Sequence, residues 1–282
     1  LGLRFEHVRS NATGDIVSAD TDTWLPRLAA TYDVQGNGKW VAQATYGHYA
    51  GRYSEAQFTG NTEVGNPSLV ISAYTGPAGQ GLGFAPGLDP ANYSVPLLGS
   101  FPTENVAFAD GLSSALNREF TASFGGEIGR KGYAKATYVR RKTSNLIDDV
   151  ITRDLGTTTV IKNGVDFGTY DNIEYRNADD LLFREYQALV LQGRYRVTDT
   201  WSFSGHWTLQ MKNDGNFEGE AANQPGAPSL FGDYPESFSA DRHYPIGRLD
   251  DFQRHKVRLW TTYLLDMGRF GALDLSGMLR LN

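Results

Sequence analysis

The sequence predicts an all-β fold: an antiparallel sheet that forms part of a transmembrane β-barrel, with short turns at one end and long loops at the other. Three observations carry this prediction. Apolar and polar residues alternate with period two along most of the chain, and short and long connections alternate between the segments. The polar positions of these segments are also too charged to fill a dry core. We therefore expect about nine membrane-crossing strands.

The first half of the chain contributes five alternating segments. In the fourth of them Phe120 and Phe124 share one face, whereas Glu119 and Glu127 share the other. Side chains of a strand point alternately to its two sides, so we expect one face to meet lipid and the other to meet the lumen. The expected strands are 1–9, 24–33, 40–53, 119–128 and 133–142.

The second half contributes four more segments, and 201–211 is the clearest of all. Trp207 and Leu209 fall on its apolar face, which predicts that they face lipid, and His206 and Thr208 fall on its polar face. The other expected strands are 189–196, 256–265 and 273–282, where Leu273, Leu275, Leu279 and Leu281 repeat the alternation.

The connections also follow a pattern. Short turns are expected at 36–39, 129–132, 197–200 and 268–271, and most of these contain glycines that supply the positive φ angles of tight hairpins. Long connections are expected at 10–22, 54–117, 143–185 and 213–252. Outer-membrane barrels have short periplasmic turns and long extracellular loops, whereas a soluble sandwich has no such regularity.

The polar face of the expected sheet is strongly basic, so it must meet water or another polar domain. We select Arg194, Arg258 and Arg280 as candidates to face the lumen and a plug domain inside it. The other basic residues of this face are Arg4, Arg27, Lys135, Arg141, Arg196 and Lys256, and its acidic residues are Glu6, Glu119, Glu127 and Asp274.

The apolar face is expected to carry an aromatic belt beside the short turns, as membrane proteins do at the interface. This belt consists of Trp40, Tyr133, Tyr195, Trp201 and Tyr263. Arg140 departs from the pattern because it shares the parity of Ala134, Ala136 and Tyr138. It lies near the long-loop end, where we expect it to meet lipid phosphates at the interface.

Composition and motifs point away from catalysis and from nucleic acid. The chain has no cysteine, and its net charge is −6. No nucleophile elbow, Walker loop or zinc-protease motif occurs, and the five histidines lack metal-ligand spacing. Adjacent carboxylates such as Asp148 and Asp149 point to opposite sides of an extended chain, so they are poor acid–base pairs. We therefore expect no enzyme activity, no cofactor, no metal site and no nucleic-acid partner.

Several stretches resemble the barrel hairpins of TonB-dependent outer-membrane receptors, and more narrowly the Oar-like subgroup with its carboxypeptidase-regulatory-like domain. The stretches are Pro26–Asp33 followed by Gly36–Lys39 and Tyr46–Tyr49, then Tyr138–Arg141 with Leu146 and Ile147, and Asp251–Lys256. The resemblance implies a barrel of about twenty-two strands, of which residues 1–282 form a C-terminal part. The plug, the energy-coupling segment and the terminal strand of the family have no counterpart among these residues.

The resemblance further implies active import of a nutrient across the outer membrane of a Gram-negative bacterium, driven by the TonB complex. The implied partners are outer-membrane lipid and lipopolysaccharide, a plug domain, the TonB complex and a small ligand: a peptide, a glycan or a metal chelate. Among the aromatic residues of the long, acidic loops, Tyr93, Phe101, Tyr234 and Tyr244 are candidates to stack on that ligand. A passive porin-like or adhesin-type barrel and a secreted soluble β-rich binding module stay open as alternatives.

Overall fold

The computed structural model describes residues 1–12, 14–51, 70–77, 89–94, 98–99, 104–151, 156–162, 164–178, 182–215, 246–249 and 251–282. Nine long strands form one antiparallel sheet, in the order β1-β2-β3-β7-β8-β13-β14-β16-β17. They are β1 (Gly2–Ala12), β2 (Ile16–Asp33), β3 (Trp40–Ala50), β7 (Leu116–Ile128), β8 (Gly132–Ser144), β13 (Arg184–Arg196), β14 (Trp201–Gly215), β16 (His255–Asp266) and β17 (Ala272–Leu281).

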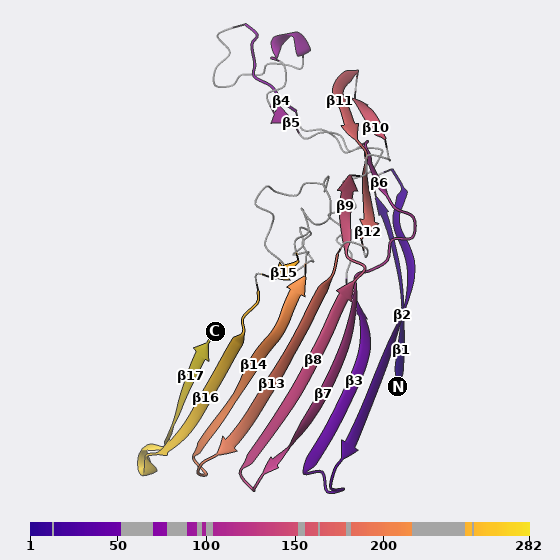
Figure 1. Ribbon diagram of the computed structural model, residues 1–282. Coiled ribbons are helices and arrows are strands. Elements are labelled where there is room, and N and C mark those ends of the chain that lie inside the picture. Colours follow the sequence, from indigo (N-terminus) through magenta and orange to yellow (C-terminus); the bar gives the residue numbers. More distant parts are fainter. Residues whose placement is uncertain are drawn as a thin grey trace.

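These strands lie side by side as one tilted wall, with the short turns at one end and the long connections at the other (Figure 1). The N-terminus and the C-terminus lie at opposite edges of this wall. The nine predicted strands and the all-β class are therefore confirmed. The short turns behave as expected from glycine, since Gly36, Gly38, Gly129, Gly268 and Gly271 all have positive φ.

The predicted long loop at 10–22 is wrong. The register of β1 and β2 continues beyond Ser10 through a bulge, and the strands are joined by a tight turn in which Gly14 and Asp15 have φ of 83° and 58°. Polar cross-strand neighbours extend the hairpin: the Nδ1 atom of His7 lies 2.9 Å from an Asp22 carboxylate oxygen. Such cross-strand pairs stabilise two paired strands without an apolar face. The pairing of β1 and β2 therefore continues beyond the residues at which the apolar alternation ends.

Short elements occupy the other long connections. They are β4 (Val70–Ile71), η1 (Pro90–Asn92), β5 (Leu98–Gly99), β6 (Val106–Phe108), β9 (Ile147–Ile151), β10 (Thr157–Lys162), β11 (Val165–Asp171), β12 (Ile173–Asn177) and β15 (Gly247–Arg248), with η3 (Gly268–Phe270) in a short turn. Strand β12 pairs with β6 in parallel and with β9 in antiparallel fashion.

The small sheet above the wall has its own buried core. Val106, Leu112, Ile147 and Tyr175 pack together there, and Leu146, Ala178 and Leu182 form a second cluster beside them. Asn177 at the end of β12 connects two neighbouring segments of this region, because its side-chain nitrogen donates to the backbone oxygens of Ser113 and Asn145 at 2.9 and 3.0 Å. Packed apolar residues therefore fix the long-loop rim, in contrast to the wall, whose apolar face is open.

Candidate functional site

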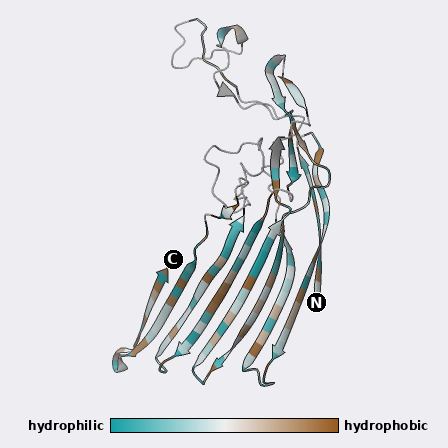
Figure 2. Cartoon of the chain, in the orientation of Figure 1, coloured by the Kyte–Doolittle hydropathy of each residue, from teal (hydrophilic) through white to brown (hydrophobic). Residues whose placement is uncertain are grey.

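The two faces of the wall differ as the alternation predicts, and teal and brown positions alternate along its strands (Figure 2). Many large apolar side chains are exposed on one face, where Phe124 is 47% and Leu279 is 50% exposed, while Trp260 and Met278 are exposed on the polar face. A contiguous apolar surface of this kind needs a lipid or protein neighbour. The register places Trp207 opposite Leu191 and Val257 on this apolar face, and His206 opposite Gln192 and Arg258 on the polar face.

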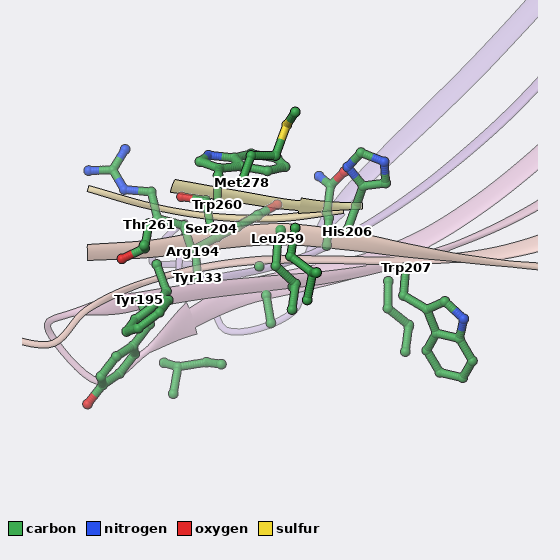
Figure 3. Close-up of a pocket in the computed structure, with 18 of the residues that line it drawn as sticks. Tyr133, Arg194, Tyr195, Ser204, His206, Trp207, Leu259, Trp260, Thr261 and Met278 are labelled. Carbon is green, nitrogen blue, oxygen red and sulfur yellow. The ribbon is translucent and has the colours of Figure 1, made fainter. Parts of the chain in front are cut away.

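The candidates Arg194, Arg258 and Arg280 lie on the polar face. His206, Arg258 and Arg280 are cross-strand neighbours in one row, and Arg194 lies opposite Ser204 in the adjacent row. Arg258 and Arg280 directly oppose each other, an arrangement that is destabilising unless an anion or water lies between them. Figure 3 shows Arg194 and His206 on one side of the sheet, with Tyr195 and Trp207 on the other.

The polar face also holds paired cations, and these lie toward the other edge of the wall. The Nε atom of Arg141 donates to the Glu119 carboxylate at 2.9 Å, and a nitrogen of Arg4 lies 3.1 Å from Glu6. Within the described part of the chain, no salt bridge forms to Arg194, Arg258 or Arg280. The wall therefore offers a basic surface over β13, β14, β16 and β17 to whatever fills the lumen.

An apolar groove crosses the lipid-facing side of the same strands (Figure 3). Its floor is formed where Gly193 lies opposite Gly205, and Tyr195, Phe203 and Trp207 stand around it. Glycine is required at this close approach, because a Cβ atom at position 205 would lie 2.8 Å from the backbone oxygen of Arg258.

The predicted aromatic belt is confirmed at four positions and wrong at one. Trp40 stacks on Phe124 with ring centroids 5.2 Å apart, and Trp201 lies opposite Tyr263, all on the apolar face with Tyr195. Tyr133 instead lies opposite Arg194, which places it on the polar face. The parity of β8 decides this position, since Ala134 and Ala136 already occupy the apolar side.

The loop candidates are only partly described. Tyr93 forms an isolated bridge with Tyr74, and their rings meet edge to face with centroids 5.6 Å apart. Phe101, Tyr234 and Tyr244 lie outside the described residues. Among the residues that are described, no cluster of three metal-binding side chains occurs, and none of the helices is long and apolar enough to span a membrane.

The sequence interpretation missed Arg118 and Lys142. Both share the parity of Phe120 and Arg140 and lie directly opposite each other on the apolar-facing side of β7 and β8. The alternation alone predicts this outward placement, because Arg118 lies two positions before Phe120 and Lys142 lies two positions after Arg140. These residues extend the outward basic group of which Arg140 is the one member that was predicted.

Several solved structures match this chain at low sequence identity. The FrpB iron transporter from Neisseria meningitidis is 10% identical with a TM-score of 0.49, over 98% of this chain and 29% of that one. The outer membrane transporter YddB from Escherichia coli is 13% identical with a TM-score of 0.47, over 86% and 27%. The siderophore receptor PirA from Acinetobacter baumannii is 12% identical with a TM-score of 0.45, over 92% and 34%.

The chain thus spans between 27% and 34% of the length of these three proteins. No curated protein matches its sequence. The family described as "Outer membrane beta barrel domain" matches residues 2–280. This match confirms the barrel prediction and the location in the outer membrane of a Gram-negative bacterium. The chain belongs to the outer membrane beta-barrel domain family.

Proposed function

We propose that this chain is part of the wall of a TonB-dependent transporter that imports a small nutrient ligand. The observation that carries the proposal is the two-faced wall, on whose polar face Arg194, Arg258 and Arg280 form no salt bridge within the described residues. A wide barrel that holds a polar plug domain would meet both needs: lipid for the apolar face and acidic partners for the basic one.

The sheet edges support a larger barrel. Strands β1 and β17 each pair with one neighbour only, so their outer backbone groups have no partner within the sheet. In a membrane such groups cost several kcal/mol each, on the order of an unmade hydrogen bond in an apolar medium, and further strands must satisfy them. We therefore take residues 1–282 to be a partial barrel domain that closes together with other strands.

The roles within this transporter follow from position. Arg194, Arg258 and Arg280 would pair with plug carboxylates or with water, which relieves the repulsion between Arg258 and Arg280. The loop aromatics Tyr93, Phe101, Tyr234 and Tyr244 would stack on the ligand. Two of the solved neighbours are named as an iron transporter and a siderophore receptor, and a metal chelate is one ligand class beside a peptide and a glycan.

Energy coupling is the decisive test of this function. Cells that carry the full-length receptor should take up the ligand only when a working TonB complex is present, because a plugged barrel has no open channel. The experiment measures cellular uptake of labelled ligands from three mixtures, one of peptides, one of glycans and one of metal chelates. A strain that lacks the receptor gene is the control. Uptake that persists without the TonB complex would show a passive, porin-like barrel instead.

The plug contact has its own test. Replacing Arg194, Arg258 and Arg280 together with alanine should loosen the plug and raise the entry of a bulky antibiotic that normally cannot pass the outer membrane. The matched control replaces Ser202, Ser204 and Thr208, which lie on the same face, with alanine. Equal antibiotic sensitivity of the two variants would contradict the plug assignment.

A further inference from the structure

A row of aromatic and charged side chains crosses the polar face of the wall near the long loops. The register joins one residue from each of β2, β3, β7, β8 and β13 into this row: Arg27, Gly47, Glu119, Arg141 and Tyr186. The ring of Tyr49 lies over Gly47, since a Cβ atom on this glycine would be only 3.0 Å from the Tyr49 hydroxyl oxygen. We call these six residues the tyrosine–arginine row.

Both tyrosine rings of the row are held by their neighbours. The Cζ atom of Arg27 lies 4.9 Å from the centre of the Tyr49 ring, and Tyr49 stays 39% exposed. The Cζ atom of Arg141 lies 5.9 Å from the centre of the Tyr186 ring, and a hydrogen bond joins the Tyr186 side chain to the buried Gln210. A ring that is already fixed loses little conformational entropy when a ligand stacks on it.

Between the two rings lies an arginine–glutamate pair that keeps free hydrogen-bonding groups. The Nε and Nη2 atoms of Arg141 both donate to the same carboxylate oxygen of Glu119, Oε2, at 2.9 and 2.5 Å. Among the residues that the structure describes, Nη1 of Arg141 and Oε1 of Glu119 have no further hydrogen-bond partner. The pair therefore offers a ligand one donor group and one acceptor, while its own charges cancel.

The rows directly above and below add mainly hydroxyl and amide groups. Below, the hydroxyls of Thr45 and Thr121 are 2.6 Å apart, and above, the Thr143 hydroxyl donates to the Asn117 side-chain oxygen at 2.6 Å. The three rows contain two further charged side chains, Arg4 and Arg184, and Asp251 accepts a hydrogen bond from Asn213 at their β14 end. This lining suits a ligand that is polar over its edges and carries no net charge.

We propose that the tyrosine–arginine row binds an uncharged glycan whose sugar rings stack on Tyr49 and Tyr186. The proposal rests on the transporter function proposed above and narrows its ligand from three classes to one. The apolar side of a sugar ring packs on an aromatic ring, and every sugar hydroxyl both donates and accepts hydrogen bonds. Sugar hydroxyls can therefore donate to Oε1 of Glu119 and accept from Nη1 of Arg141.

The distance between the two rings sets the size of the ligand. Three steps between neighbouring strands separate β3 from β13. At about 4.8 Å per step, the two tyrosines lie roughly 14 Å apart across the sheet. A single sugar cannot contact both rings, so we expect an oligosaccharide to bind more tightly than its monosaccharide.

The test measures equilibrium binding to the purified full-length receptor, which needs no TonB complex. Failure of this site is thereby distinguished from failure of energy-driven uptake. The probes are a panel of uncharged oligosaccharides with α- or β-linkages, the corresponding monosaccharides, a neutral peptide and a ferric catecholate chelate. The wild type should bind at least one oligosaccharide of the panel, and at least about tenfold more tightly than the monosaccharide, because two stacked rings contribute instead of one.

Two variants of the row have matched controls in the same strands. Tyr49→Ala and Glu119→Gln should each weaken oligosaccharide binding about fivefold or more, since they remove a stacked ring and a charge-assisted acceptor. The first control is Tyr46→Ala, because Tyr46 is 38% exposed on the opposite face of β3. The second is Glu127→Gln, on the polar face of β7 next to its short turn. Both controls should bind within about twofold of the wild type.

A heat-modifiable band on gels shows that each variant is folded. If Tyr49→Ala does not fold, Tyr49→Phe should bind like the wild type and Tyr49→Leu should not, because only phenylalanine keeps the ring. A wild type that binds none of the oligosaccharides, or row variants that bind like their controls, would overturn the proposal. It would also be overturned if Tyr49→Ala abolished binding of the peptide or the chelate instead. Antibiotic entry raised as in the triple arginine variant would show that the row contacts the plug rather than a glycan.

Discussion

At the scale of single residues, His206 and Trp207 are neighbours in the chain that meet different environments. The Trp207 indole lies on the apolar face, where its nitrogen is 3.2 Å from Nδ1 of His255, and the two rings stack with centroids 5.7 Å apart. His206 faces the opposite side, edge-on to Trp260 at 5.9 Å. One step along a strand therefore separates a lipid contact from a hydrated one.

This difference predicts unequal tolerance of a new charge. Trp207→Arg should block assembly, because an arginine on the lipid face costs about 2–4 kcal/mol near the membrane midplane. His206→Arg should assemble, since a lumen arginine keeps its water even beside Arg258. The amount of folded, heat-modifiable full-length protein in the outer-membrane fraction measures both. Equal assembly of the two variants would contradict the register.

Residue parity could be predicted wherever the alternation was unbroken. The placement of Trp207 and Leu209 on the apolar face and of Arg194, Arg258 and Arg280 on the polar face follows from period two alone. Tyr133 was misplaced because its aromatic character was given more weight than its parity. Residue type is a weaker guide than position in a two-sided sheet.

At the scale of elements, the turn between β2 and β3 shows how a short connection is fixed. The Asp33 carboxylate accepts the backbone N–H groups of Gly38, Gln35 and Gly36, the last two at 3.2 and 3.0 Å. The bond from Gly38 and the other backbone bonds lower the pKa of Asp33 below its usual value of 3.8. The ionised carboxylate therefore accepts hydrogen bonds from turn N–H groups that have no acceptor on a neighbouring strand.

Removing this carboxylate should weaken the hairpin. Asp33→Ala should lower the temperature at which the folded form disappears at pH 7. Because the pKa of Asp33 is lowered on folding, its contribution is fully present above pH 3.8 and is lost as the pH falls through the lowered value. The difference between variant and wild type should therefore shrink toward pH 2 in a thermal gel-shift series.

The control for this prediction is Asp199→Ala in the turn between β13 and β14. There Thr198 and Thr200 contact each other through their hydroxyls at 3.2 Å. The control removes the same charge from a turn of the same end of the wall. A loss of stability as large as that of Asp33→Ala, or a difference that does not change with pH, would contradict the role assigned to Asp33.

The nine long strands could be predicted because each carries its own local pattern, and the short turns because glycine marks them. The hairpin tip at 10–22 could not, since its strands are held by polar cross-strand pairs such as His7 and Asp22 rather than by an apolar face. The small sheet of β6, β9 and β12 was also missed. Its partners come from segments far apart in sequence, and its parallel pairing leaves no hairpin signal.

At the scale of the whole molecule, the wall and the long connections carry charge of opposite sign. The polar face over β13, β14, β16 and β17 is basic, whereas the long connections are acidic. Between Arg52 and Arg118 there is no lysine or arginine, and the acidic residues there are Glu55, Glu63, Asp89, Glu104 and Asp110. The segment 213–252 adds Asp214, Glu218, Glu220, Asp233, Glu236, Asp241, Asp250 and Asp251, against Arg242 and Arg248.

This charge pattern predicts which ligands the mouth of the barrel admits. Acidic loops should repel a polyanion such as a ferric catecholate chelate and should admit neutral or cationic peptides and glycans, which bind by stacking on aromatic rings. The screening length is about 8 Å at physiological salt, so the repulsion acts within the mouth itself. We expect replacement of the five carboxylates between Arg52 and Arg118 by their amides to raise binding of the polyanionic chelate severalfold and to leave neutral ligands unaffected.

The measurement is binding of labelled chelate, neutral glycan and cationic peptide to cells that carry the full-length receptor, at low and at physiological salt. Higher salt should narrow the gap between wild type and the amide variant, because it screens the charges that separate them. The matched control changes Asp266 and Asp274, which lie near the short turn at the opposite end of the wall, to asparagine. Tight binding of the polyanion to the unmodified mouth, or an amide variant that behaves like this control, would show that the acidic loops do not select the ligand.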